Sequence, residues 1–202
     1  MSRIDITALL GNAGIAEETV DKVVEIDAML QNWRRRAMRR ELGHRALLDL
    51  KIDIDLAQLD VLMAIEASVD EFGDAARTET MVNSVAERLA IDPSRASRVV
   101  GEMVAAGYAR RAVSQSDARR TIVELTSAGQ EVVDAVRAYK FLIMGHFLSS
   151  WERKELEAFT PLLRQFSQWP DHAERGADKF AAEIAALAER ISSTSPNGKD
   201  ES

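Results

Sequence analysis

The stretch IDPSRASRVVGEMVAAGY, residues 91–108, decides the fold of this chain. Asp92 followed by Pro93 predicts a helix start, because an aspartate accepts hydrogen bonds from the free N–H groups of the first turn and proline lacks one. Gly107 predicts the end of the same helix. The residues expected to face inward, at the spacing of one helical face, are Ala96, Val99, Val100 and Met103. The stretch therefore predicts a short helix with a polar outer surface.

A second short helix is expected just upstream, over residues 78–90, with one apolar face. Two short helices joined by three or four residues form a helix-turn-helix. Asp55 and Gln58 fit a capping box and predict a further helix upstream of these two. That helix is expected to end near the loop SVDEFGDAAR, residues 68–77.

A β-hairpin is expected downstream of Gly107. YARRAV (108–113) and TIVELT (121–126) are typical of short strands, and the polar loop between them is rich in turn residues. Thr126 or Ser127 is then expected to cap a long helix.

Long helices flank this central part. Apolar residues at steps of three and four predict one amphipathic helix from about residue 17 to residue 50, which would run about 45 Å. We expect a helix of that length to pack against another subunit. Further helices are expected from Ser149, with Glu152 three residues later, and over residues 178–191, and the tail SSTSPNGKDES, residues 192–202, is expected to be disordered.

The composition excludes several classes of protein. The 202 residues include no cysteine, so disulfides and thiolate metal sites are excluded. His44, His146 and His172 are dispersed, and we expect no metal site and no cofactor. No apolar run is long enough to span a membrane, and no secretory signal is apparent, so a cytoplasmic protein with no membrane partner is expected.

The charge is distributed unevenly along the chain. The formal net charge is −7, but residues 77–120 contain eight basic and five acidic residues, a net charge of +3. The remainder of the chain therefore carries −10. A basic middle between acidic arms is expected if only the middle faces a polyanion.

Two motifs resemble the MarR family of bacterial transcription regulators. RASRVVGEMVAAGYARR, residues 95–111, resembles the recognition helix of that family running into the first strand of its wing. DARRTIVELTSAG, residues 117–129, is similar to the wing signature, which places Asp117, Arg119, Leu125, Thr126 and Gly129 on its characteristic positions. The similarity extends over about residues 56–129.

This resemblance implies a fold class and a function. The fold would be mainly α with a small β-hairpin wing, a winged helix-turn-helix with long N- and C-terminal dimerisation helices. We expect an N-terminal dimerisation helix (1–54), a DNA-binding lobe (55–126), C-terminal dimerisation helices (127–191) and the tail (192–202). The function would be that of a sequence-specific DNA-binding transcriptional regulator, a repressor, which acts as a homodimer on a pseudo-palindromic operator and is relieved by a small aromatic or acidic ligand.

The candidate DNA contacts lie on the recognition helix and the wing. They are Ser94, Arg95, Ser97, Arg98, Asp117, Arg119 and Arg120. Arg98 is the first candidate for a base edge, and a phosphate contact is the alternative. On an extended strand Asp117 and Arg119 would emerge on one face and pair, and Arg120 would point to the other face.

Two further groups of residues are open to two interpretations. A ligand pocket could be lined by Trp33, Arg40, Met63, Phe141 and Met144, and the alternative is that these residues are core filling. The basic run contains Arg34, Arg35, Arg36, Arg39, Arg40 and Arg45. It could contact DNA, but we favour a solvated or subunit-interface face that pairs with acidic outer helices.

The sequence contains no phosphate-binding glycine loop, nucleophile elbow, HExxH spacing or kinase signature, so we expect no enzyme. The partners expected are double-stranded DNA, a second copy of the chain and a small-molecule effector. The alternative function is that of a helical dimeric protein-binding module, or an anti-regulator, that does not bind DNA.

Overall fold

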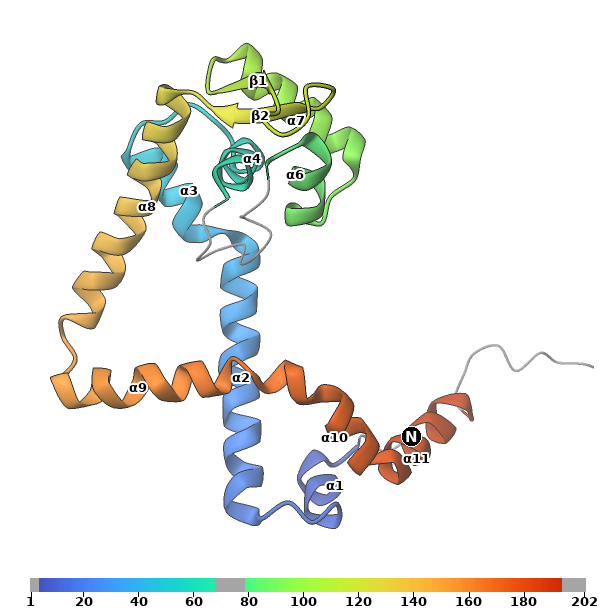
Figure 1. Ribbon diagram of the computed structural model, residues 1–202. Coiled ribbons are helices and arrows are strands. Elements are labelled where there is room, and N and C mark those ends of the chain that lie inside the picture. Colours follow the sequence, from blue (N-terminus) through green and yellow to red (C-terminus); the bar gives the residue numbers. More distant parts are fainter. Residues whose placement is uncertain (1–3, 68–78, 194–202) are drawn as a thin grey trace, which may run out of the picture. The chain divides into compact units, whose positions relative to one another are not determined.

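The computed structural model describes residues 4–67 and 79–193 and divides into two compact units (Figure 1). The central unit comprises residues 36–149. The outer unit combines the residues up to 35 with those from 150 onward.

The central unit is mainly helical with one antiparallel hairpin, as the sequence predicts. Its elements are α3 (Glu41–Asp49), α4 (Leu56–Glu66), α6 (Val82–Leu89), α7 (Pro93–Ala105), β1 (Ala109–Val113), β2 (Thr121–Leu125) and α8 (Ser127–Leu148). In the hairpin Ala109 pairs with Leu125 and Val113 pairs with Thr121. This order of elements is that of a winged helix-turn-helix.

The core of the central unit lies among α4, α6 and α7 and extends to the hairpin and α8. Its largest fully buried side chains are Val61, Leu62, Val85, Val100, Met103 and Val133. The inward stripe predicted for the helix at 93–105 is confirmed, since Ala96, Val99, Val100 and Met103 are each at most 2% exposed. The opposite face of α7 is left to solvent.

The predicted start and end of α7 and the predicted start of α4 are confirmed. The Asp92 side chain accepts from the N–H groups of Ser94 and Arg95, and Pro93 is the first residue of α7. Gly107 has φ +81°, the left-handed conformation that favours glycine. Asp55 and Gln58 form both hydrogen bonds of a capping box at the start of α4.

The end of α7, the base of the hairpin and the start of α8 meet at Thr126. Its hydroxyl donates to the carbonyl of Gly107 over 2.7 Å and accepts from the N–H of Gly129 over 3.2 Å. Its own N–H donates to the carbonyl of Tyr108 over 3.0 Å. We call this group of contacts the Thr126 junction. It confirms Thr126 as the cap of α8.

The prediction of a single helix over residues 17–50 is wrong. The structure has α2 (Glu17–Arg39) and α3, and Arg40 between them has φ +54°. A left-handed arginine is strained. The strain is compensated because the Arg40 side chain donates to the carbonyl of Leu56 and pairs with Asp60 on α4.

The helix expected over 78–90 begins later, at Val82. Residue Thr80 instead lies beside β2, because its carbonyl accepts from the N–H of Val123 over 2.8 Å. The Thr80 hydroxyl also donates to the carbonyl of Ile65 at the end of α4. The predicted loop at 68–77 lies outside the described residues.

The outer unit is helical throughout its described part. Besides most of α2 it contains α1 (Ile6–Asn12), which was not predicted, α9 (Arg153–Phe166), the short 3₁₀ helix η2 (Trp169–His172), α10 (Ala173–Lys179) and α11 (Ala181–Ser192). The start predicted at Ser149 is wrong, because Glu152 and Glu155 form the capping box of α9. The helix predicted over 178–191 is interrupted at Phe180, where α10 ends.

None of the residues in α9, α10 and α11 is buried within the single chain. The residues from 194 onward, where the disordered tail is expected, lie outside the described residues. No helix in the described ranges combines the length and the apolar character that crossing a membrane requires.

The Thr126 junction generates a prediction about glycine. A Cβ on Gly129 would collide with the carbonyl oxygen of Tyr108 and lie 3.0 Å from its carbonyl carbon. Gly129→Ala should therefore lower the free energy of unfolding by ~1–3 kcal/mol, the usual range for overpacking. Urea unfolding at fixed protein concentration measures the change.

Gly101 in α7 provides the matched control, because a Cβ there meets nothing within 4 Å. Gly101→Ala should raise stability by roughly 0.5–1 kcal/mol, since alanine loses less backbone entropy in a helix. Equal effects of the two substitutions would contradict the close approach at Gly129.

Candidate nucleic-acid interface

The first two turns of α7 present polar side chains to solvent. Ser94, Arg95, Ser97 and Arg98 are all exposed, opposite the buried stripe of the same helix. Hydrogen bonds from the Ser94 hydroxyl and from the N–H groups of Ser94 and Arg95 lower the pKa of Asp92 below its usual value. The structure thus brings the four predicted α7 residues onto one exposed surface at the start of the helix.

Arg98 is held by a neighbour that the sequence analysis did not single out. Its Nη1 donates to Oε1 of Glu102, one turn later, over 2.5 Å. Glu102 also accepts from Nε2 of Gln58, on α4, over 3.3 Å. The spacing of four residues could have indicated the first contact, but the contact with Gln58 joins residues far apart in the chain.

The tip of the hairpin is a tight turn and not an extended strand. The N–H of Arg120 donates to the carbonyl of Asp117 over 2.9 Å, which places Ala118 and Arg119 at the centre of the turn. The Asp117 carboxylate accepts from the N–H of Arg119 over 3.0 Å and lies 3.5 Å from Nε of Arg120. The predicted side-chain pair of Asp117 and Arg119 is therefore wrong, because the turn brings Arg120 to the carboxylate.

Glu79 holds the base of this loop. Its carboxylate accepts from the hydroxyls of Ser114 and Ser116 and, over 3.0 Å, from the N–H of Gln115. We call these contacts the Glu79 clasp. The Ser114 hydroxyl, foremost among these donors, lowers the pKa of Glu79 below its usual value. Sequence reasoning missed the clasp, because 35 residues separate Glu79 from Ser114.

Four of the eight basic residues counted in the middle of the chain form contacts within the lobe, and two of these are the pairs of Arg98 with Glu102 and of Arg120 with Asp117. Arg88 donates to the carbonyl of Ala64 and to the hydroxyl of Thr80, and burial lowers its pKa. Arg110 pairs with Glu124 across the hairpin at 2.8 Å. Besides Arg110, the exposed basic side chains among the described residues of this segment lie on α7, on β1 and at the tip of the hairpin, and they are Arg95, Arg98, Arg111, Arg119 and Arg120.

The five residues predicted for a ligand pocket are not brought together within the central unit. Trp33 belongs to the outer unit. Arg40 is occupied by Leu56 and Asp60, and burial lowers its pKa. Met63 packs against the core of the central unit.

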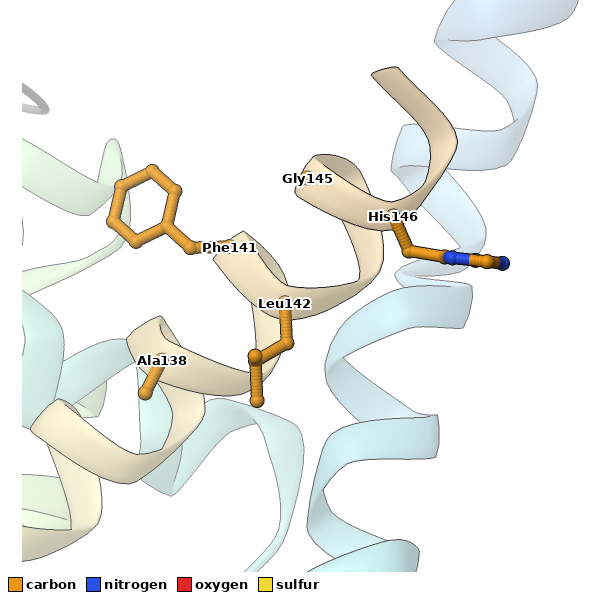
Figure 2. Close-up of a pocket in the computed structure, with 5 residues that line it drawn as sticks. All are labelled: Ala138, Phe141, Leu142, Gly145 and His146. Carbon is orange, nitrogen blue, oxygen red and sulfur yellow. The ribbon is translucent and has the colours of Figure 1, made fainter. Parts of the chain in front are cut away.

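Phe141 and Met144 lie on the second half of α8, where both are exposed. Phe141 borders a shallow open hollow together with Ala138, Leu142, Gly145 and His146 (Figure 2). All five lining residues come from α8, and Figure 2 shows Phe141 and His146 pointing in different directions. One helix face of this kind does not enclose a ligand.

Apart from Arg40, which pairs with Asp60 on α4, the basic run forms local ion pairs where the structure shows its partners. Glu41 lies 3.3 Å from Arg36 and 3.8 Å from Arg39, and Asp49 lies 2.8 Å from Arg45. These acidic partners stand within five residues of the arginines and not on the outer helices. Among the described residues no cluster of three histidine or carboxylate side chains could hold a metal ion.

An exposed helix following a tight turn, flanked by a hairpin with a basic tip, defines a winged helix-turn-helix lobe. Residues 52–120 match the model of the MarR family. The resemblance predicted from the sequence is thereby confirmed, and over these residues the chain is similar to the MarR family. Members of this family are transcription regulators and not enzymes, which agrees with the expectation that this chain is not an enzyme.

Solved structures show the same fold. A MarR family protein from Bacillus stearothermophilus is 18% identical, with a TM-score of 0.59 over 75% of this chain and 96% of its own. RV1404 from Mycobacterium tuberculosis is 20% identical, with a TM-score of 0.55 over 77% and 97%. S. aureus MepR bound to ethidium bromide is 20% identical, with a TM-score of 0.50 over 67% and 92%. No curated protein matches the chain significantly.

The Glu79 clasp generates a prediction about the wing. Glu79→Ala removes both acceptor oxygens, so the amide of Gln115 should lose most of its protection against hydrogen exchange at neutral pH. Because the pKa of Glu79 is lowered in the folded state, its ionised form stabilises the clasp. Protection in the wild type should therefore persist above the usual glutamate pKa and fall as the pH drops through the lowered value. Amide exchange followed by NMR, expressed as protection factors, measures both effects.

Glu124→Ala is the control, because it removes a wing carboxylate whose partner is Arg110 and which does not contact Gln115. If Glu79→Ala left the protection of Gln115 unchanged, or if Glu124→Ala reduced it as much, the clasp would not hold the loop.

Proposed function

We propose that this protein is a sequence-specific DNA-binding transcriptional regulator that acts as a homodimer on a pseudo-palindromic operator. The observation that carries the proposal is the exposed start of α7, which offers Arg95 and Arg98 in the same lobe as the basic tip of the hairpin. The family match over residues 52–120 supports it.

The recognition helix would enter the major groove by its first turns. Ser94, Arg95 and Ser97 stand at the start of α7, where their exposed side chains and the positive end of the helix dipole favour phosphate oxygens. Arg98 lies further along the same exposed surface and could bond a guanine edge with two N–H groups. In this arrangement Ser94 and Arg95 position the helix and Arg98 reads sequence.

The wing would follow the adjacent minor groove. Arg119 stands at the centre of the turn at the hairpin tip, and its guanidinium has no ion pair among the described residues. A narrow A·T-rich minor groove attracts such a side chain through its negative potential. Arg120, which is paired with Asp117, would contact phosphate.

A second copy of the chain would cover the apolar surface that one chain leaves exposed. On α8, Phe141, Leu142, Ile143, Met144 and Phe147 are each at least 45% exposed, and they occupy every side of the helix. A helix that is apolar all round belongs in an interior. In the outer unit Phe159, Leu162 and Leu163 on α9 are exposed as well. A symmetric dimer would place two recognition helices about 34 Å apart, or a small multiple of it, on one face of the duplex.

We further propose that the regulator is a repressor, released by a small aromatic or acidic ligand. The similar fold of S. aureus MepR, whose structure was solved bound to ethidium bromide, supports the aromatic alternative. Phe141 and Met144 on α8 would form part of the apolar binding surface for this ligand, and a second chain would supply the rest. Because its partner is genomic DNA, we place the protein in the cytoplasm.

The alternative is a helical dimer that binds only proteins. The exposed apolar faces of α8 and α9 would serve that function equally well. The exposed arginines of α7 and the hairpin tip would then have no role. DNA binding separates the two functions.

Binding to DNA should depend strongly on salt. With three to five phosphate contacts in each subunit, the slope of log K against log[salt] should be about −5 to −9, at roughly −0.9 for each contact. Fluorescence anisotropy with a duplex selected from random DNA measures the slope, and sedimentation of the complex should give two chains for each duplex.

The same titration with a non-selected duplex of equal length is the control for sequence preference. A slope near zero, or the absence of binding to any duplex at low salt, would favour the protein-binding alternative.

The two arginines at the hairpin tip should contribute unequally. Arg119→Ala should weaken operator binding by ~1–3 kcal/mol for each subunit, the range of a groove contact. Arg120→Ala should have a distinctly smaller effect, because its guanidinium is already paired with Asp117. Affinities of both variants are compared on one operator at one salt concentration, and equal losses would mean that Arg119 has no special place in the groove.

A further inference from the structure

Glu102 stands in an unusual position for a carboxylate on α7. It lies in the last turn of the helix, where the helix dipole disfavours negative charge. Its partner Arg98 is four residues earlier, and an acidic residue that follows its basic partner is the less favourable order for such a pair. The Arg98 side chain is also 65% exposed, and exposed pairs add little to stability. Helix stability therefore does not explain Glu102.

A second contact fixes the direction of the Glu102 carboxylate. The amide oxygen of Gln58 accepts from the N–H of Asp55 over 3.0 Å, as part of the capping box of α4. The amide nitrogen of Gln58 is thereby turned toward Glu102 and donates to its Oε2. The other oxygen, Oε1, accepts from Arg98. The start of α4 thus orients a carboxylate that in turn orients the arginine.

This arrangement has two consequences on a duplex. An arginine that is held before binding loses less side-chain entropy when its remaining N–H groups reach a base edge. A carboxylate beside the recognition surface also repels phosphates, and this repulsion is present on every DNA sequence. Only a base pair whose edge accepts hydrogen bonds from Arg98 offsets this repulsion. Specific binding is therefore favoured over binding through phosphates alone.

We infer that Glu102 is a specificity-determining residue, which positions Arg98 for one base pair of each half-site and penalises DNA that does not offer that base pair. The inference rests on the proposed function as a DNA-binding regulator. It adds to that function a residue that makes the protein bind its operator in preference to other DNA.

The test uses the full-length protein and a duplex selected by it from random DNA. Affinities of the wild type, Glu102→Gln, Glu102→Ala and Arg98→Ala are measured at one salt concentration on three kinds of duplex. These are the selected duplex, variants with each half-site base pair replaced in turn, and a scrambled duplex. Glu124→Gln is the matched control, because it also removes the carboxylate of an exposed pair with arginine in the same lobe.

Both Glu102 variants should bind the scrambled duplex more tightly, by about three- to tenfold, because a negative charge is removed from each subunit. The base pair that Arg98 reads is the one whose replacement does not change the affinity of Arg98→Ala. At that base pair both Glu102 variants should also discriminate less between the selected duplex and the replaced one, by about tenfold for Glu102→Ala. Arg98→Ala should lose the same discrimination but bind the scrambled duplex less tightly. Glu124→Gln should keep the discrimination. A variant that merely folds poorly would weaken binding to every duplex.

The inference would be overturned if both Glu102 variants kept full discrimination at the base pair that Arg98 reads. It would also be overturned if they bound all duplexes more weakly by the same factor. If the wild type prefers its selected duplex and the Glu102 variants behave like it, only this inference fails. If the wild type binds no duplex, the proposed function fails and the inference fails with it.

Discussion

The carbonyl group of Tyr108 is the constraint on which the central unit depends. The N–H of Thr126 donates to its oxygen, and Gly129 approaches it so closely that no side chain fits there. Together with the hydrogen bonds of the Thr126 hydroxyl to Gly107 and Gly129, this carbonyl joins the exit of α7, the base of the hairpin and the first turn of α8. These contacts link the position of α7 to that of the hairpin, which the proposed binding of both to one duplex requires.

The sequence predicts best those elements whose signals are local. The start of α7 follows from Asp92 and Pro93, and its buried stripe follows from a spacing of three and four residues. The hairpin follows from two short apolar runs around polar turn residues. In each case the interactions that form the element lie within one turn or one hairpin.

The predictions fail where a distant contact overrides the local pattern. The residues around Arg40 favour a continuous helix, but the contacts of Arg40 with Leu56 and Asp60 on another helix stabilise the break. Thr80 has helical neighbours in sequence, but it bonds to β2. Counting charges along the sequence has the same weakness. Arg88 is counted as a surface charge, but in the structure it donates hydrogen bonds to Ala64 and Thr80 within the lobe. The candidate site shows this contrast too, because Arg98 is evident from its place on the helix while the connection from Gln58 through Glu102 is not.

The bond between Thr80 and β2 has a mechanical consequence for control of DNA binding. Because Thr80 is joined to β2 by its carbonyl and to the end of α4 by its hydroxyl, a movement of β2 relative to α4 would break one of these hydrogen bonds. These hydrogen bonds favour movement of the lobe as one body over a change in its shape. In the proposed dimer, the distance between the two lobes would then control binding, because the helical repeat of DNA permits only certain distances.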